Sequence, residues 1–82
     1  MANNDLSLLS QLGMRIAYLR KERGMSQLDL SVETGLSKSY LSDLENGRRN
    51  PSVLTCQRIA SSLNIPLEEL FRGIVPLEDL LK

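Results

Sequence analysis

Hydrophobic residues recur every three or four positions along most of this chain, and no segment alternates in the manner of a β-strand. The first periodic segment covers about residues 6–23, and Asp5 or Ser7 can cap its start. Its narrow apolar stripe consists of Leu9, Leu12, Ile16 and Leu19. Gly24 ends the segment, whereas Gly13 lies inside it and makes the helix ~1 kcal/mol less stable than alanine would. We therefore expect a long first helix that another element approaches closely at Gly13.

Two shorter helical segments follow, joined by a glycine. Ser26 can cap the first of them, with Asp29 three residues later as an acidic variant of the capping box. Gly35 interrupts this helix because glycine adopts the left-handed conformation without steric strain, and Ser37 can cap the next helix. The expected apolar positions are Leu28, Leu30 and Val32 in the first helix and Leu41 and Leu44 in the second. The second helix should turn polar side chains outward, namely those of Lys38, Ser39, Ser42, Asp43 and Asn46.

Two more helical segments complete the pattern. Ser52 can cap a fourth helix, whose expected core face consists of Val53, Cys56, Ile59, Ala60 and Leu63. Pro66 favours the start of a fifth helix and Gly73 ends it, with apolar positions at Leu67, Leu70 and Phe71. The sequence thus predicts an all-α fold, a compact five-helix domain with a short C-terminal apolar tail, in which one domain covers residues 1–82.

The C-terminal tail, residues 74–82, is unusually apolar: five of its nine residues are large and aliphatic, although the fifth helix already closes the bundle. Exposed apolar surface on a small domain tends to bind a partner. One interpretation is a dimerisation region at about 64–82, with an interface formed by Leu67, Leu70, Phe71, Ile74, Val75, Leu77, Leu80 and Leu81. The other interpretation is that the tail folds back over the core of its own chain. The sequence leaves both open.

The composition limits the classes of function. The net charge is zero, yet residues 15–58 contain eight basic and five acidic residues, a local excess of +3 that suits a nucleic-acid partner. The absence of histidine and the single cysteine exclude a zinc finger or a His-based catalytic site within this chain. Cys56 is most simply a small core residue, with a redox switch as the alternative. Because no signal-peptide pattern, cysteine pair or apolar run of ~20 residues is present, we expect a cytoplasmic protein.

The segment at residues 26–51 joins the two short helices to a basic loop and reads SQLDLSVETGLSKSYLSDLENGRRNP. It resembles the helix-turn-helix of the Cro/repressor-type (Xre) family, which includes lambda-type phage repressors and restriction-modification controller proteins. The helix-turn-helix itself falls at about 26–46. The resemblance extends over about 12–71 and rests on LRKERGMSQ at 19–27, Leu30, Gly35, Leu36-Ser37, Leu41-Ser42, Leu44-Glu45-Asn46-Gly47 and Pro51. Ser31 stands where the family usually has alanine, and serine is nearly as small.

The resemblance implies a lambda-repressor-like fold and roles for the polar residues. Base contacts in the major groove are expected from Lys38, Ser39, Ser42 and Asp43, because lysine can donate to guanine, serine can pair with several bases and aspartate can accept from cytosine N4. Contacts with the sugar-phosphate backbone are expected from Gln27, Tyr40, Asn46, Arg48 and Arg49. Arg20 and Glu45 are expected to form a largely buried ion pair that fixes the docking angle. The alternative for each surface residue is a solvated side chain without a role, and Tyr40 could instead pack on the second helix.

These features lead us to expect a sequence-specific, double-stranded-DNA-binding transcriptional regulator that acts as a homodimer on a near-palindromic operator, such as a restriction-modification controller or a mobile-element repressor. The competing interpretation is a protein-interaction or antitoxin-type module that uses the same fold, with the fifth helix and the tail as its working surface. The sequence gives no support for an enzyme, because it contains no pattern of residues that would activate a carboxylate or a serine for catalysis. RNA polymerase is a further candidate partner, and nothing in the sequence indicates a cofactor, a metal ion, a membrane or a small-molecule ligand.

Overall fold

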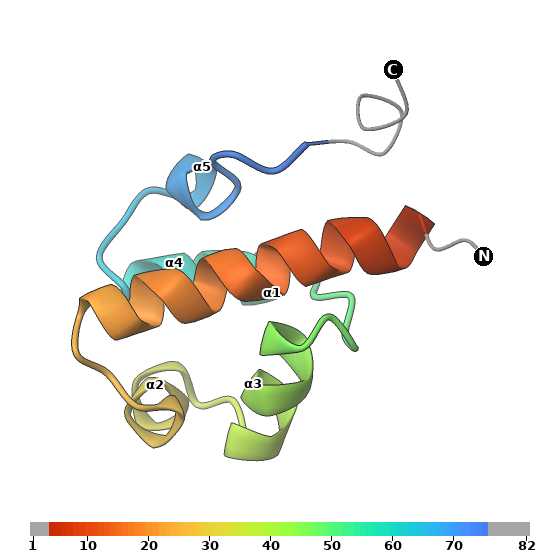
Figure 1. Ribbon diagram of the computed structural model, residues 1–82. Coiled ribbons are helices and arrows are strands. Elements are labelled where there is room, and N and C mark those ends of the chain that lie inside the picture. Colours follow the sequence, from red (N-terminus) through yellow and green to blue (C-terminus); the bar gives the residue numbers. More distant parts are fainter. Residues whose placement is uncertain (1–3, 76–82) are drawn as a thin grey trace.

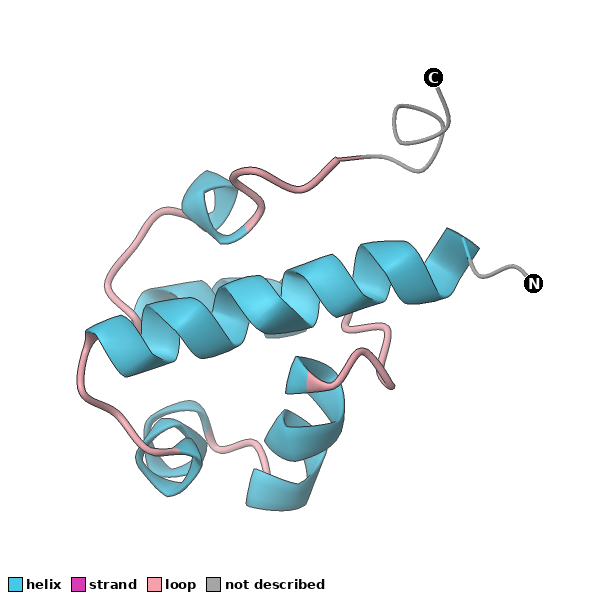
Figure 2. Ribbon diagram, viewed as in Figure 1, coloured by secondary structure: helices cyan, strands magenta, loops and turns pink. Residues whose placement is uncertain are grey.

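The structure, a computed structural model, describes the backbone of residues 4–75 and the side chains of residues 8–75. Within that part of the chain it contains five helices and no strand (Figures 1 and 2). These are α1 (Asn4–Glu22), α2 (Gln27–Thr34), α3 (Lys38–Glu45), α4 (Val53–Ser62) and α5 (Leu67–Leu70). The long α1 crosses the molecule, with α2 and α3 on one side of it and α5 on the other (Figure 1). The prediction of an all-α, five-helix fold is confirmed.

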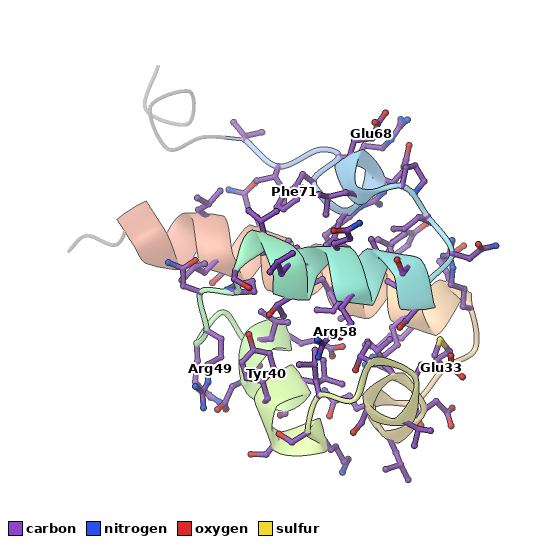
Figure 3. All side chains as sticks on the ribbon, turned by 180° about the vertical axis from the view of Figure 1, so that it is seen from behind. Glu33, Tyr40, Arg49, Arg58, Glu68 and Phe71 are labelled. Atoms are coloured by element: carbon purple, nitrogen blue, oxygen red, sulfur yellow. The ribbon has the colours of Figure 1, made fainter. Side chains whose placement is uncertain are left out.

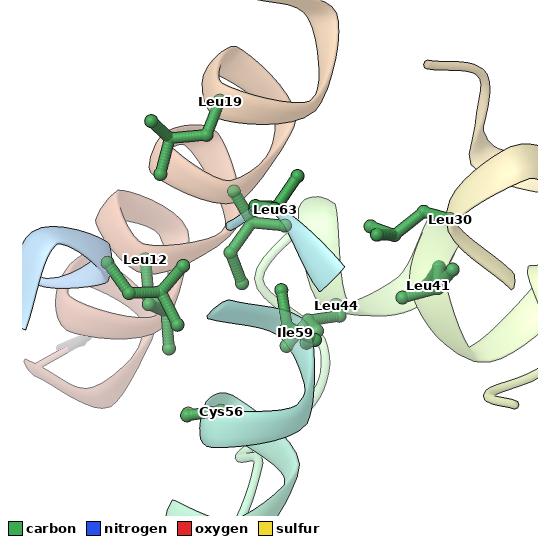
Figure 4. Packing of buried hydrophobic residues seen from close by; sticks show 10 residues of the cluster. Leu12, Leu19, Leu30, Leu41, Leu44, Cys56, Ile59 and Leu63 are labelled. Carbon is green, nitrogen blue, oxygen red and sulfur yellow. The ribbon is translucent and has the colours of Figure 1, made fainter. Parts of the chain in front are cut away.

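One cluster of buried side chains holds the helices together (Figure 4). Every helix contributes to it, and its members are Leu12, Ile16, Leu19, Leu30, Leu41, Leu44, Cys56, Ile59, Leu63 and Leu70. Burying a leucine or isoleucine side chain stabilises a fold by about 1.5–3 kcal/mol, so this cluster is the main source of stability in a small domain. Cys56 is a buried core residue, as predicted, and burial raises the pKa of its thiol.

The short helices begin at the predicted caps. The Ser26 hydroxyl accepts a hydrogen bond from the Asp29 backbone N–H at 2.9 Å, and the Asp29 carboxylate accepts one from the Ser26 N–H at 2.9 Å. Ser37 and Ser52 cap α3 and α4 in the same way, through one hydroxyl each. Gly35 ends α2 with φ of +79°, in the left-handed region. Local chemistry therefore sets the boundaries of helices too short to be stable alone.

Three apolar residues expected in the core are on the surface. Leu28, Val32 and Val53 are 58%, 75% and 71% exposed. In α2, residues two apart point to opposite sides, so Leu28 and Val32 share the outer face while Leu30 occupies the inner one. The second inner position is taken by Thr34, whose hydroxyl donates to the Leu30 carbonyl at 2.7 Å and so can be buried.

The end of the described chain is attached to α1. The Gln11 amide donates to the Val75 carbonyl at 3.1 Å and accepts from the Val75 N–H at 2.9 Å. Arg15 donates from Nε and Nη2 to the Glu69 carbonyl at 3.1 and 3.0 Å, which attaches α5 to the same face. The predicted interface residues Leu77, Leu80 and Leu81 lie outside the described residues. Among the helices that the structure describes, none has the length and hydropathy to span a bilayer.

Candidate nucleic-acid interface

Residues 35–37 join α2 to α3 in a short turn that is fixed from both sides. The Ser31 hydroxyl donates to the Leu36 carbonyl at 2.5 Å, and the Leu36 N–H donates to the Thr34 hydroxyl at 3.1 Å. The Leu36 side chain packs against the core cluster. Serine in place of the family's alanine at position 31 thus fits between the helices and also bonds the turn. The two helices are held at one angle without a bound partner.

α3 has one buried face and one polar face. Leu41 and Leu44 are completely buried, which places the helix firmly on the core. The opposite face presents five polar side chains: Lys38, Ser39 and Asn46 are exposed, and Ser42 and Asp43 are half-buried. A helix that enters the major groove needs this arrangement, because one side must set its angle while the other reaches the base edges.

A buried network joins α1, α2 and α3 behind this polar face. Arg20 donates from Nε to Glu45 Oε2 at 2.7 Å and from Nη2 to Glu45 Oε1 at 2.9 Å, a two-point ion pair. Its Nη1 donates to the Met25 carbonyl at 2.7 Å. The side chains of Arg20 and Glu45 are only 9% and 7% exposed. The hydrogen bonds to Glu45 raise the pKa of Arg20 above the ordinary value for arginine, and this effect outweighs burial, which lowers it.

Gln27 completes the network from the first residue of α2. Its Nε2 donates to Glu45 Oε1 at 2.9 Å, so the amide supports the end of α3 from inside. The amide nitrogen carries a second N–H that this hydrogen bond does not use. Asn46 is used locally as well, because its Nδ2 donates to the Ser42 carbonyl at 2.8 Å.

The basic loop after α3 contacts Asp43. Arg48 Nη1 lies 3.5 Å from Asp43 Oδ1 and Arg49 Nε lies 3.5 Å from Asp43 Oδ2. The Arg48 N–H also donates to the Asp43 carbonyl at 2.9 Å. The guanidinium of Arg49 lies 5.3 Å from the centre of the Tyr40 ring, and Figure 3 shows the two side chains together beside α3. Tyr40 packs against the core cluster, and burial raises the pKa of its hydroxyl.

A second surface feature is an apolar groove of about 310 Å³ between α1, the start of α4 and the chain after α5. Its lining includes Leu8, Leu9, Leu12, Pro51, Val53, Cys56, Phe71 and Ile74. Phe71 and Ile74 are among the residues predicted from the sequence for a dimer interface, whereas Leu8 and Val53 are not. Helical periodicity can place Leu8 on one face of α1 and Val53 on one face of α4. It cannot show that these faces lie next to residues 71–74.

Leu70 corrects the predicted interface. It is completely buried in its own core, so it cannot contact a second copy, and Leu67 is half-buried against the same cluster. The physical reason is that α5 has only four residues, of which Leu70 alone is fully buried. Its side chain packs into the core cluster and so holds this short helix on the rest of the domain. Phe71 and Val75 remain 42% and 36% exposed. Within the described chain, no group of three or more His, Cys, Asp or Glu residues could hold a metal ion.

Comparison with known proteins agrees with this geometry. A family model described as helix-turn-helix, HTH_3, matches residues 16–70. An uncharacterised HTH-type transcriptional regulator, y4dJ, from Sinorhizobium fredii is 42% identical over 59 residues, which cover 72% of this chain and 77% of that protein. The chain spans only 46% of the length of two other matched proteins.

Solved structures resemble the whole fold. The restriction-modification controller protein C.AhdI from Aeromonas hydrophila superposes with a TM-score of 0.75 at 38% identity, covering 77% of this chain and 96% of that one. The controller protein C.Esp1396I, solved as a tetramer in complex with its natural 35-base-pair operator, superposes with a TM-score of 0.74 at 29% identity. That match covers 92% of this chain and 96% of the controller.

Proposed function

Because this chain belongs to the helix-turn-helix family HTH_3, we propose that it is a transcriptional regulator that binds double-stranded DNA in a sequence-specific manner. The observation that carries the proposal is the orientation of α3: its apolar side is buried, its polar side is open, and the Arg20–Glu45 ion pair fixes its end. The relatives named above are regulators and controllers, and we assign this chain a non-catalytic role like theirs.

We assign direct base contacts to the exposed first and second turns of α3. Lys38 would donate to guanine O6 or N7, and Ser39 and Ser42 would pair with neighbouring base edges. Backbone contacts would come from Tyr40 within α3 and from four residues near its C-terminal end, Gln27, Asn46, Arg48 and Arg49. The positive loop supplies the electrostatic, sequence-independent part of the affinity.

We propose further that the protein binds as a homodimer. The C.Esp1396I controller assembles on its operator as a tetramer, and the C.AhdI controller superposes over most of its length. In this chain, the apolar groove is lined by no residue of α3, and Phe71 beside it and Val75 are exposed. We propose that a second copy binds at this groove and leaves the polar face of α3 open. Half-sites would be spaced by one helical turn, ~34 Å, on a near-palindromic operator. A restriction-modification controller or a mobile-element repressor fits this arrangement, and the buried free thiol of Cys56 suits a cytoplasmic site of action.

The proposal is tested by selecting bound sites from a pool of random duplexes. The expected result is enrichment of an inverted repeat, with each half-site contacted in the major groove. A DNA-binding protein that makes six to ten phosphate contacts also loses about 10³–10⁵ in affinity between about 50 and 200 mM salt. No enriched sequence, together with weak binding that is insensitive to salt, would support a protein-interaction module instead.

A further inference from the structure

Asp43 places a negative charge beside the basic loop, on the surface that we propose binds DNA. An acidic side chain on the polar face of α3 lies within 3.5 Å of both Arg48 and Arg49, the two cations best placed for phosphates. Neither arginine approaches any other carboxylate among the described ion pairs. In this structure, therefore, one carboxylate of the protein contacts both of these cations.

These ion pairs are weak enough to be exchanged. The side chains of Arg48, Arg49 and Asp43 are 67%, 52% and 32% exposed, and solvent screens pairs of this kind strongly. Both N–O distances are 3.5 Å, whereas strong charge-assisted hydrogen bonds are about 2.7–2.9 Å long. A phosphate group, with its several acceptor oxygens, can displace the carboxylate from both arginines.

Two further interactions hold the arginines near α3. The N–H of Arg48 donates to the Asp43 carbonyl at 2.9 Å, which returns the loop to α3. Arg49 stacks over Tyr40, one helical turn before Asp43. Each arginine is thus held close to α3 by an interaction that does not depend on the Asp43 carboxylate.

We propose that Asp43 is a specificity-determining residue, an internal anion that DNA phosphates must displace from Arg48 and Arg49. This inference rests on the proposed function. DNA that offers phosphates alone must compete with the carboxylate, so binding through backbone contacts is weakened. At the operator, Asp43 lies among the base-contacting residues and can accept a hydrogen bond from a cytosine amino group, which compensates its charge. Asp43 therefore widens the difference in affinity between the operator and other DNA.

The test compares Asp43→Asn, which removes the charge and keeps the size, with Glu68→Gln, which removes one negative charge on the far side of the molecule (Figure 3). Each variant is titrated with the selected operator and with a scrambled duplex. At low salt, Asp43→Asn should bind the scrambled duplex about fivefold more tightly, with a salt slope steeper by about one unit. The ratio of operator affinity to scrambled affinity should fall, and Glu68→Gln should behave as the wild type does.

A second arm asks whether the effect passes through the arginines. In an Arg48→Gln/Arg49→Gln background, Asp43→Asn should no longer tighten binding to the scrambled duplex, as a double-mutant cycle requires for coupled residues. The inference would be overturned if Asp43→Asn and Glu68→Gln bound the scrambled duplex with equal affinity. It would also be overturned if Asp43→Asn tightened binding to this duplex as much without the two arginines as with them. A wild-type protein that binds neither duplex would instead overturn the proposed function, before any variant is made.

Discussion

Gly13 of α1 lies directly against the backbone of Glu45 in α3. A Cβ atom at position 13 would lie 2.7 Å from the Glu45 carbonyl oxygen and 2.8 Å from its carbonyl carbon, and it would also overlap the Leu44 carbonyl oxygen. The two helices can approach this closely only because position 13 has no side chain. The predicted close approach at Gly13 is confirmed, and it sets how far α3 extends from the body.

Replacing Gly13 by alanine should destabilise the domain, even though alanine is the better helix former by ~1 kcal/mol. The atoms that the new methyl group would meet belong to the backbone and cannot turn away, and such overpacking typically costs about 1–3 kcal/mol. Unfolding in urea measures the change in the free energy of unfolding. Met14→Ala, at the adjacent and 68% exposed position, is the control and should have little effect. A Gly13→Ala variant more stable than the wild type would contradict the packing described here.

Removing Glu45 should damage folding more than removing Gln27. Glu45→Ala leaves the buried Arg20 guanidinium without its partner, and loss of one member of a buried pair costs about 3–5 kcal/mol. Gln27→Ala removes one hydrogen bond to the same carboxylate and leaves the ion pair intact, at a cost of about 1 kcal/mol. Thermal unfolding of the two variants checks this order. Near-normal melting of Glu45→Ala with a lost preference for the operator would contradict it.

The capping box of α2 should make stability depend on pH in the acid range. The hydrogen bond from the Ser26 N–H is the main reason that the pKa of Asp29 lies below its ordinary value of 3.8, and the nearby Ser26 side chain lowers it as well. Because the folded pKa is the lower one, the stabilisation is fully present above the ordinary value and is lost as pH falls through the folded pKa. The free energy of unfolding of the wild type should exceed that of Asp29→Asn at neutral pH, and the difference should shrink below about pH 4. A difference that stays constant into acid would contradict this origin.

The apolar groove can be tested with a matched pair of exposed valines. Val53 lines the groove and is 71% exposed, whereas Val32 lies on α2 and is 75% exposed. Val53→Ser should weaken dimerisation by about tenfold or more, because it removes apolar area from the proposed contact, whereas Val32→Ser should leave it unchanged. Sedimentation equilibrium measures both dissociation constants. Equal effects of the two substitutions would place the dimer interface elsewhere.

The elements of this fold could be predicted from the sequence because their signals are local. Ser26 with Asp29, Ser37, Ser52 and Gly35 act within three residues of the helix ends that they define. The buried leucines of α3 likewise follow from the spacing of Leu41 and Leu44. Such features need no knowledge of the rest of the chain.

Other features depend on contacts between distant residues, which spacing does not reveal. The hydrogen bonds between Gln11 and Val75 join positions 64 residues apart. The exposure of Leu28 and Val32 depends on which side of α2 packs against the core. The sequence alone does not show which of the apolar residues of this short helix lie on that side. The contact of Asp43 with both arginines depends on how the loop returns to α3 after Gly47.

In the proposed complex, α3 reads the bases while the loop after it contacts phosphates. Lys38→Ala and Arg48→Ala remove one positive charge each, so they form a matched pair. Arg48→Ala should weaken binding to all duplexes similarly and lower the salt slope by about one unit.

The most direct measurement is the affinity of Lys38→Ala for a set of operators that each carry one changed base pair. The preference of this variant should change by about 1–3 kcal/mol at one position of each half-site and stay as in the wild type elsewhere. Uniform weakening across the set, like that expected of Arg48→Ala, would contradict the claim that α3 reads the sequence.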